Sequence, residues 1–522
     1  MDFRSDKTAK PLGCRAFLFG VLLIFAGAPA VFSNAAPQPT PETSKQIIKQ
    51  AKKLERRGDL SGAESSIASA LLSTPEDVSL KLALASVYLK QKRVLKAFDI
   101  AFPIARDDPK NAEAFAILGT VYLATGEFKI ARTLLVNSIT LDKKQALAWG
   151  SLGMLEFYEN DIPESVANLQ EATFRDPREP DYHFALAQVT ARGERYKESA
   201  EAYRKFLSVA PKNDKERRDK IKGLIKFLSF LGSRNFIYGV GGEPETSVDV
   251  ELINNRPIIE IKINKDKRPL RFVLDTGSGI TVISEKTARE FKIKPVAAGG
   301  LARALGGGGK FDIVYGFLES VDVGEARIRN VPVYIRKFQD VGTKVDGFIG
   351  LSLISKYLTT LDYGKKKLIL SIRDKADPEI ADPRALSIPL KLTSSGFLSG
   401  NVTLPGVESD LYFIVDTGAS VSVVSHTVAE MDEVKKHLQE ERLRVIGAAG
   451  VTEGVPMLLL KDVQFGGFSR SELRAVALNL DIINEAAGFM QAGILGGNFL
   501  KDYRLIFDFK RSRITLVPHG DS

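Results

Sequence analysis

The chain has 522 residues, of which 44% are apolar and 26% are charged, and its net charge is +9 at neutral pH. This composition is typical of a folded protein with several domains and argues against a collagen, a long disordered tract or a protein with many membrane spans. Basic residues cluster from Lys212 to Lys226, but no nucleic-acid-binding motif accompanies them. We interpret the cluster as the solvated face of a helix and expect no nucleic acid among the partners.

Residues 1–35 have the features of a secretion signal. Basic residues between Arg4 and Arg15 precede an apolar stretch over residues 16–32, and the small residues 33–35 (Ser-Asn-Ala) follow it. Signal peptidase recognises this order of a basic start, an apolar core and a small-residue end. We therefore expect an exported chain, located in the bacterial periplasm. An uncleaved N-terminal anchor stays open as an alternative, and only in that case do we expect contact with a membrane.

Residues 44–215 repeat with a period of 34 residues. Prolines mark one grid, which only Lys143 interrupts; they are Pro75, Pro109, Pro177 and Pro211 (109 − 75 = 34). Leucines followed by Ala or Gly mark a second grid, namely Leu84, Leu118, Leu152 and Leu186. Small residues mark a third grid at Ala63, Ala97, Ala131, Ser165 and Ser199. Small residues at fixed points let two helices approach closely, and a proline ends each helix pair, so the period predicts stacked helix pairs.

This pattern resembles tetratricopeptide repeats, about five of them, over residues 44–232. The resemblance implies an all-α solenoid, and we expect the amphipathic stretch 221–231 to cap its end. The concave face of such a solenoid commonly binds a peptide or a protein, so we expect a protein partner there. A spacer, or a docking surface for the rest of the chain, is the alternative. Residues 233–247, which include the glycine-rich stretch GVGGEPETS, are expected to be a linker.

After Val248 the chain changes to short, alternating apolar segments separated by glycine, proline and charged turns, which is a strand pattern. Features of this region occur twice. Asp-Thr-Gly follows an apolar strand at Asp275 and again at Asp416, 141 residues later (416 − 275 = 141). The sequence thus predicts two related β lobes, at residues 248–385 and 386–520.

The two copies resemble the retropepsin-like aspartic proteases, and more distantly the two-lobed pepsin class, over residues 248–520. The motifs that carry the likeness are an apolar strand, Asp-Thr-Gly, a second strand that ends in serine, and a later apolar-Gly pair. The resemblance implies a mainly-β bilobal acid-protease fold with Asp275 and Asp416 as the catalytic dyad. It also implies that Thr276 and Thr417 hydrogen-bond across the lobe interface and fix the geometry of the dyad.

Two carboxylates a few ångströms apart cannot both ionise cheaply, so one keeps a proton and the pair titrates as a unit. The ionised member can take a proton from a bound water as this water attacks a peptide carbonyl, while the protonated member donates to the developing oxyanion. This chemistry needs no metal and no cofactor, and we expect neither. The expected function is therefore an aspartic endopeptidase acting on a peptide or protein substrate. An inactive peptide-binding protein with the same fold is the alternative, as is a dyad formed between two molecules.

The residues that follow each aspartate are expected to support it. Gly277 and Gly418 allow a tight turn and leave backbone donors near the carboxylates. The next position differs, because Ser278 stands in the first copy and Ala419 in the second. Since a hydroxyl can stabilise an ionised carboxylate, we expect Asp275 to be the more acidic member of the pair.

Two further sets of residues keep step between the copies. The apolar-Gly pairs Ile349–Gly350 and Leu495–Gly496 are expected to pack behind the two turns. Gly306 and Gly447 both lie 31 residues after their aspartates (306 − 275 = 31 and 447 − 416 = 31). We expect flap tips there that fold over a bound peptide, formed with Gly307, Gly308, Gly309 and Gly450. An ordinary loop is the competing interpretation of these glycines.

Other chemistries find little support. The four histidines, His183, His426, His437 and His519, are too scattered for a metal site, and no G-x-S-x-G motif of serine hydrolases is present. The glycines at 306–309 do not make a phosphate loop, because the motif needs a glycine at position 304 and a hydroxyl at position 311. The only cysteine, Cys14, precedes the apolar stretch of the signal-like segment, so the exported chain would have no disulfide.

Overall fold

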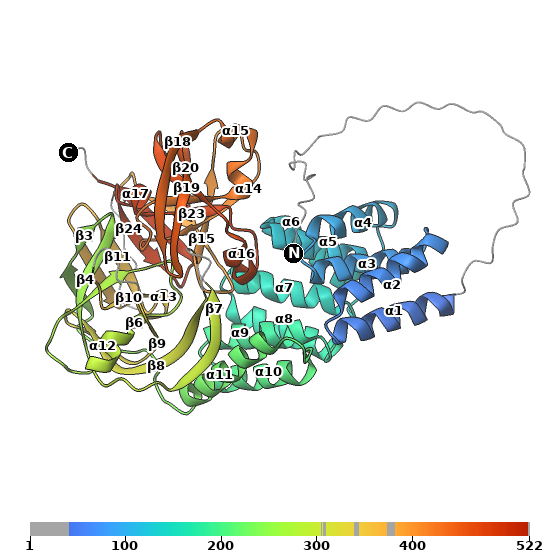
Figure 1. Ribbon diagram of the computed structural model, residues 1–522, viewed down its shortest axis with the longest axis horizontal. Coiled ribbons are helices and arrows are strands. Elements are labelled where there is room, and N and C mark those ends of the chain that lie inside the picture. The colour runs from blue at the N-terminus through green and yellow to red at the C-terminus, as the bar shows by residue number, and fades with distance from the viewer. Residues whose placement is uncertain (1–40, 304, 306–309, 339–343, 373–381, 520–522) are drawn as a thin grey trace, which may run out of the picture.

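The computed structural model describes residues 41–303, 305, 310–338, 344–372 and 382–519 (Figure 1). The expected signal segment at residues 1–35 and the expected flap glycines Gly306–Gly309 lie outside these ranges. Within them, helices fill the N-terminal part and strands most of the C-terminal part, which confirms the fold class predicted from the sequence. None of the helices in these ranges has the length and apolar character of a membrane span.

The described N-terminal part consists of five consecutive helix pairs and a final helix. The pairs are α1 (Pro41–Arg56) with α2 (Leu60–Ser73), α3 (Val78–Lys90) with α4 (Val94–Asp107), α5 (Ala112–Thr125) with α6 (Phe128–Leu141), α7 (Ala146–Tyr158) with α8 (Ile162–Arg175), and α9 (Pro180–Arg192) with α10 (Tyr196–Val209). The final helix is α11 (Lys215–Gly232), which includes the expected cap. The pairs stack side by side into a solenoid (Figure 1), as the repeat predicts.

The grids of small residues mark the places where paired helices touch. A Cβ atom added to Gly119 in α5 would lie 2.6 Å from Cγ of Leu135 in α6, and one added to Gly153 in α7 would lie 2.7 Å from Cγ of Leu169 in α8. On the third grid, the buried hydroxyl of Ser165 donates a hydrogen bond of 2.6 Å to the carbonyl of Gly153. Larger side chains at these positions would push the close-packed helices apart. The period of the sequence therefore reflects a packing requirement.

The described residues of the C-terminal part form three sheets. The first lies in lobe 1 and runs in the order β1 (Gly239–Gly242), β9 (Ala326–Arg336), β6 (Val282–Ser284), β10 (Gly347–Ile349), β5 (Leu270–Leu274), β4 (Arg256–Ile263), β8 (Lys310–Val323) and β7 (Ala297–Arg303), with β3 (Glu251–Ile253) paired to β4. The second lies in lobe 2 and runs in the order β18 (Leu438–Gly447), β19 (Gly450–Leu460), β22 (Leu473–Leu478), β17 (Ser422–Ser425), β23 (Gly493–Leu495), β16 (Leu411–Val415), β15 (Leu398–Thr403), β20 (Val463–Phe465) and β21 (Phe468–Arg470), with β14 (Lys391–Leu392) paired to β15.

The third sheet joins the lobes. Its order is β13 (Leu386–Pro389), β25 (Arg513–Pro518), β24 (Tyr503–Asp508), β11 (Tyr357–Asp362), β12 (Lys367–Ile372) and β2 (Glu245–Asp249). At its centre, β11 of lobe 1 pairs antiparallel with β24 of lobe 2. Short helices lie between the strands, at α12 (Glu285–Glu290), α13 (Leu351–Ile354), α14 (His426–Ala429), α15 (Asp432–Lys435), α16 (Asp481–Ala487) and α17 (Gly497–Leu500).

The lobes repeat the same strand register. Ile258 of β4 lies opposite Val273 of β5, and Ser399 of β15 lies opposite Ile414 of β16. Both strands keep one offset (399 − 258 = 141 and 414 − 273 = 141). Because the same residues pair in each copy, positions that differ by this offset occupy equivalent places in the two lobes.

The expected linker at residues 233–247 is partly wrong. Residues 239–242 form β1, which pairs with β9, and residues 245–249 form β2, which pairs with β12. Both strands lie at the ends of their sheets. A glycine-rich strand is tolerated at an edge because few side chains need to pack there. Gly242, at φ 88°, provides the turn between the two strands.

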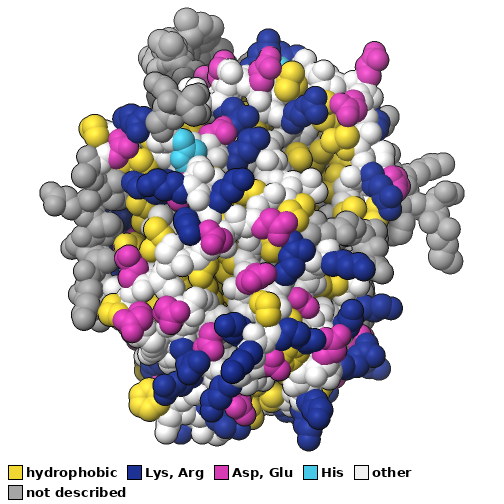
Figure 2. All heavy atoms as spheres, turned by 90° about the vertical axis from the view of Figure 1, so that its left-hand side faces the viewer, with side chains coloured by type: hydrophobic (Ala, Val, Ile, Leu, Met, Phe, Trp, Pro, Cys, Tyr) yellow, Lys and Arg dark blue, Asp and Glu magenta, His cyan; other side chains and the backbone are white. Residues whose placement is uncertain are grey.

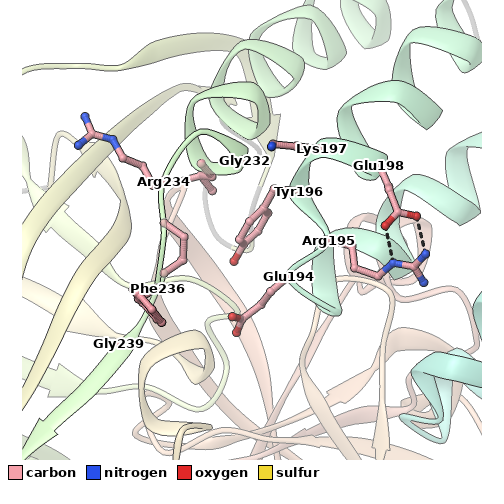
Figure 3. Close-up of a pocket in the computed structure, with 11 residues that line it drawn as sticks. Glu194, Arg195, Tyr196, Lys197, Glu198, Gly232, Arg234, Phe236 and Gly239 are labelled. Carbon is pink, nitrogen blue, oxygen red and sulfur yellow. Dashed lines mark hydrogen bonds and ion pairs between the residues drawn. The ribbon is translucent and has the colours of Figure 1, made fainter.

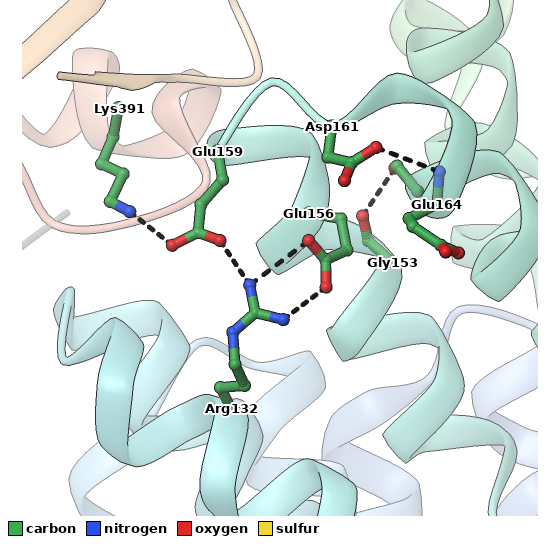
Figure 4. Close-up of polar contacts among 8 residues, drawn as sticks. Arg132, Gly153, Glu156, Glu159, Asp161, Glu164 and Lys391 are labelled. Atoms are coloured by element: carbon green, nitrogen blue, oxygen red, sulfur yellow. Dashed lines mark hydrogen bonds and ion pairs between the residues drawn. The ribbon is translucent and has the colours of Figure 1, made fainter. Parts of the chain in front are cut away.

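The solenoid packs against both lobes. Phe128 and Tyr158 of α6 and α7 pack edge-on or tilted against Phe489 and Tyr412 of lobe 2, with ring centroids 5.0 to 5.4 Å apart. Beside them, an ion-pair network links the two parts through Arg132, Glu156, Glu159 and Lys391 (Figure 4). Arg192 of α9 donates hydrogen bonds to the carbonyl of Thr393 in lobe 2 and to that of Phe157 in α7, the latter at 3.1 Å.

The last helix of the solenoid packs against lobe 1. A Cβ atom added to Gly223 of α11 would lie 2.1 Å from the carbonyl oxygen of Ala298 in β7, so the two backbones touch. Phe227 stacks on Tyr315 of β8 with ring centroids 4.5 Å apart, and Phe230 meets Phe317 edge-on at 5.2 Å. The helix therefore lies directly on the β7–β8 hairpin, the strands that lead to the expected first flap tip.

Candidate active site

The two Asp-Thr-Gly turns meet at the centre of the β part. Each follows the end of a strand, β5 for Asp275 and β16 for Asp416. The backbone N–H of Asp275 donates to the carbonyl of Ile349, and that of Asp416 donates to the carbonyl of Leu495, both at 3.0 Å. The apolar-Gly pairs thus lie behind the turns, where the sequence predicts them.

Four crossed hydrogen bonds join the turns through their threonines. The Thr276 hydroxyl donates to the carbonyl of Val415 at 2.7 Å, and the Thr417 hydroxyl donates to the carbonyl of Leu274 at 2.6 Å. Each hydroxyl also accepts the backbone N–H of the other threonine, at 3.0 and 3.2 Å. All of these groups belong to one chain, so the lobes pair within the molecule. The bonds fix the relative position of the two aspartates.

The glycines of the turns make room for the carboxylates. A Cβ atom added to Gly277 would lie 2.4 Å from Cγ of Asp416, and one added to Gly418 would lie 2.7 Å from Cγ of Asp275. Each glycine therefore faces the carboxylate of the other lobe. Any side chain there would displace the dyad, which explains why both positions hold glycine.

The glycines behind the turns are equally confined. A Cβ atom added to Gly350 would lie 2.6 Å from the carbonyl carbon of Ile280, and one added to Gly496 would lie 2.8 Å from that of Val421. Their backbone N–H groups donate to the hydroxyls of Thr281 and Ser422, at 3.3 and 3.0 Å. Sequence reasoning missed these two hydroxyl residues. Their shared offset (422 − 281 = 141) is the signal that could have found them.

The two carboxyl groups interact, and both resist ionisation. Burial, together with the charge of Asp416 and a hydrogen bond to it, raises the pKa of Asp275 well above its usual range. Burial also raises the pKa of Asp416, but hydrogen bonds from the backbone N–H groups of Gly418, Ala419 and Gly277 oppose the rise. The bond from Gly418 measures 2.8 Å. More backbone N–H groups thus stabilise the ionised form of Asp416 than that of Asp275.

The backbone donors favour ionisation of Asp416, whereas Ser278 led us to expect Asp275 as the more acidic member. The Ser278 hydroxyl donates to the carbonyl of Ile280 at 2.8 Å and is used within its own turn. The hydroxyl therefore does not donate a hydrogen bond to the Asp275 carboxylate, although the expected higher acidity of Asp275 depended on such a bond. Backbone N–H groups, which no sequence pattern displays, decide the order instead.

Both aspartates line a cavity of about 1980 Å³. Both lobes line it, and so do side chains from α7 to α11 of the solenoid, among them Phe184, Tyr203 and Leu224. A second, smaller cavity of about 490 Å³ lies between α10, α11 and β1 (Figure 3), away from the dyad. It contains no paired carboxyl groups among its described lining residues, and its Arg195 and Glu198 bind each other. The paired carboxyl groups of Asp275 and Asp416 line the large cavity.

Two hairpins, β7–β8 and β18–β19, contribute side chains to the lining of the cavity that holds the dyad. The second, β18–β19, turns between the paired Gly447 and Gly450, and Gly450 has a φ of 147° that favours glycine. Its tip meets lobe 1, because the Ala449 N–H donates to the carbonyl of Leu305 at 3.0 Å. Arg336 of β9 donates to the carbonyl of Ala448 in the same tip.

Sequence reasoning also missed Arg256, the first residue of β4. It lines the cavity beside Asp275, and its charge lowers the pKa of that aspartate, opposing the larger effect of burial. In the described ranges no group of three or more His, Cys, Asp or Glu side chains could hold a metal ion.

Comparison with known proteins agrees with this geometry. Residues 259–353 and 401–499 match the model of a family described as aspartyl protease, and residues 48–112 and 151–214 match a tetratricopeptide repeat family. Two tandem segments thus match the aspartyl-protease model and follow segments that match a tetratricopeptide repeat model, which confirms the resemblance predicted from the sequence. No curated protein matches the chain.

Solved structures with a similar course of the chain include one protein for each part. The aspartic proteinase from Irpex lacteus is 13% identical over 52% of this chain and 97% of its own, with a TM-score of 0.36. A thermophilic tetratricopeptide repeat protein of Thermus thermophilus is 18% identical over 36% of this chain and 98% of its own, with a TM-score of 0.29.

Proposed function

We propose that the protein is an aspartic endopeptidase that hydrolyses peptide bonds with a water molecule activated between Asp275 and Asp416. The observation that supports this most is the set of crossed hydrogen bonds of Thr276 and Thr417, which brings the two carboxyl groups of one chain into contact. Two carboxyl groups that share a proton can serve as base and acid at once.

The order of acidity assigns a role to each member. Asp416, the more readily ionised, takes a proton from the water as its oxygen attacks the carbonyl carbon of the substrate. Asp275 gives its proton to the carbonyl oxygen, which becomes a hydroxyl of the tetrahedral intermediate. When the C–N bond breaks, the proton held by Asp416 passes to the leaving nitrogen. The hydroxyl proton returns to Asp275, so the dyad regains its starting state.

The solenoid would serve recruitment, with a peptide or protein as its partner. Its C-terminal helices share the large cavity with the dyad, so a chain bound along them could enter the cleft directly. This shared wall favours a role in delivering substrate over a role as spacer. It would equally serve a protein that only holds peptides.

Replacement of either aspartate tests the proposal. The purified protein would be incubated with a peptide library from acid to neutral pH, beside Asp275→Asn and Asp416→Asn. Cleavage by the unaltered protein and its loss in both variants is the expected result, whereas Asp107→Asn, which changes an exposed aspartate of α4, should cleave normally. Cleavage that survives in both site variants would refute the mechanism. Peptide binding without cleavage at any pH would identify a peptide-binding protein.

We also propose that the chain is exported to the bacterial periplasm. Residues 1–35 support this, through their basic start and the apolar stretch that follows. Cell fractionation with N-terminal sequencing of the protein tests the idea. A periplasmic protein that begins near residue 36 is the expected result. A cytoplasmic protein that retains residues 1–35 would contradict it.

A further inference from the structure

The equivalent positions of the two lobes differ in a way that bears on substrate choice. By the shared register, Arg256 at the start of β4 is equivalent to Phe397, next to the start of β15 (397 − 256 = 141). In the same way Arg336 lies beside Ser284, and Leu478 lies beside the equivalent Ser425. The side chains of the two arginines and of their apolar counterparts all line the cavity of the dyad; they are Arg256, Arg336, Phe397 and Leu478. Lobe 1 thus presents arginines where lobe 2 presents apolar side chains.

The two arginines are only partly satisfied by the described residues. The Nε atoms of both Arg256 and Arg336 are buried and find no hydrogen-bond partner among them. Arg336 still packs its guanidinium 4.0 Å above the ring of Phe311 and donates to the carbonyl of Ala448. Burial lowers the pKa of both groups, and at Arg256 the charge of Asp275 opposes this effect.

The acidic side chains of the lobe 1 wall, apart from the dyad, already have partners. The Asp346 carboxylate accepts hydrogen bonds from the hydroxyl of Thr287 at 2.8 Å and from the backbone N–H of Arg271 at 2.9 Å. Glu285 forms an ion pair with Arg289 at 3.2 Å. On the outer face drawn in Figure 2, basic and acidic side chains are interspersed. The two arginines whose Nε atoms lack a partner among the described residues line the cavity that holds the dyad.

The wall of lobe 2 around Phe397 is apolar, and Arg444, which lines the cavity elsewhere in lobe 2, forms an ion pair with Glu453 at 3.1 Å. Ile414, Val476, Leu478 and Ile494 form a buried cluster, and Phe397 packs against it. Since equivalent positions lie on opposite sides of the dyad, a peptide extended across the cleft would meet an arginine on one side of its scissile bond. On the other side it would meet Phe397.

We propose that the cleft selects peptides with an acidic side chain on one side of the scissile bond, bound by Arg256, and a large apolar side chain on the other, packed against Phe397. This inference rests on the proposed function. A carboxylate would give the buried Nε of Arg256 the charge-assisted partner that the described residues do not supply. Arg336, already bonded to the flap tip, would add positive charge from the same side.

The test uses quenched fluorescent peptides that differ only at the two residues around the scissile bond: Glu-Leu, Leu-Glu, Gln-Leu and Leu-Gln. We expect the intact protein to cleave one of the glutamate peptides with a kcat/KM about tenfold above that of its glutamine analogue, as one charge-assisted hydrogen bond implies. In Arg256→Gln this ratio should fall to near one. Arg268→Gln changes an exposed arginine of lobe 1 that does not line the cavity and should keep the full ratio.

The ratio compares two peptides on one enzyme, so any effect of Arg256 on the dyad cancels. Equal cleavage of glutamate and glutamine peptides by the intact protein would overturn the inference while leaving the endopeptidase in place. So would a preference that persists in Arg256→Gln. If no peptide is cleaved, the proposed function fails, and fluorescence anisotropy with the same peptides decides the inference. A glutamate preference in binding that Arg256→Gln removes would support it, and equal binding would reject it.

Discussion

The crossed threonine bonds have a cost that can be measured. Thr417→Val would leave the carbonyl of Leu274 and the N–H of Thr276 buried without their partner, at about 1–3 kcal/mol for each group. We expect a lower free energy of unfolding in urea and slower peptide cleavage, because the aspartates lose their fixed separation. Thr417→Ser keeps the hydroxyl and should retain most of both properties. Equal behaviour of the valine and serine variants would show that these hydrogen bonds contribute little.

The raised pKa of Asp275 makes the native state less stable as pH rises. Between the unfolded pKa of about 3.9 and the raised native value, the native protein binds more protons than the unfolded chain, so its stability falls with pH in this window. Asp275→Asn cannot ionise and escapes the loss. Its thermal midpoint should exceed that of the unaltered protein by a margin that grows from pH 4 to 7. A margin that stays constant over this range would contradict the assignment of the proton.

Arg256 should influence the alkaline limit of activity. Its positive charge lowers the pKa of Asp275, so Arg256→Gln should raise that pKa further and keep Asp275 protonated to higher pH. The alkaline limb of the kcat/KM profile for a neutral peptide would then shift to higher pH. Arg256→Lys keeps a positive charge and should shift it less. An unmoved limb in Arg256→Gln would show that another group sets the limit.

At the residue scale, the sequence revealed the dyad and the residues packed around it but not the division of roles. Asp275 and Asp416 could be found because the same tripeptide recurs at one offset. Their relative acidity depends on where N–H groups point, and on the hydroxyl of Ser278 bonding to Ile280 rather than to Asp275. Such directions follow from tertiary packing, which the order of residue types does not record.

At the scale of elements, α11 connects the solenoid with the first flap hairpin. Phe227 stacks on Tyr315 of β8, so Phe227→Leu should loosen the hairpin while keeping an apolar side chain in the core. We expect faster hydrogen exchange in residues 310–323 and a lower kcat/KM, with unchanged exchange in α5 and α6. Phe174→Leu, on an exposed side chain of α8, is the matched control. Unchanged exchange in the hairpin would mean that α11 does not restrain it.

The sequence indicated this helix but only half of its role. Its apolar face predicts that residues 221–231 cap the end of a solenoid. In the structure these residues belong to α11, the last helix of the solenoid. The other half of its role is the contact with lobe 1. This contact joins Gly223 to Ala298, which lie 75 positions apart (298 − 223 = 75) and share no sequence pattern. The strands β1 and β2 were not predicted for the same reason, because their partners β9 and β12 lie far along the chain.

At the scale of the whole molecule, Arg192 joins the solenoid to lobe 2. Its guanidinium lies 3.6 Å above the ring of Phe157 and bonds to the carbonyls of Phe157 and Thr393. Arg192→Met would remove these bonds and weaken the docking of the two parts. We expect this variant to have a larger radius of gyration in small-angle X-ray scattering than the unaltered protein. We also expect its cleavage rate to fall more for long substrates than for short peptides. Arg106→Met, at an exposed ion pair, is the control, and identical scattering of the Arg192 variant would show that other contacts suffice.

The pairing of β11 with β24 has a consequence for how the proposed endopeptidase would behave at low abundance. A protease whose two halves come from separate copies loses activity on dilution, because the copies drift apart. Here both halves of the shared sheet are segments of one polypeptide, and each covers the open edge of the other. Specific activity should therefore stay constant down to the smallest amount that can be assayed, so that a few molecules in a compartment remain fully competent.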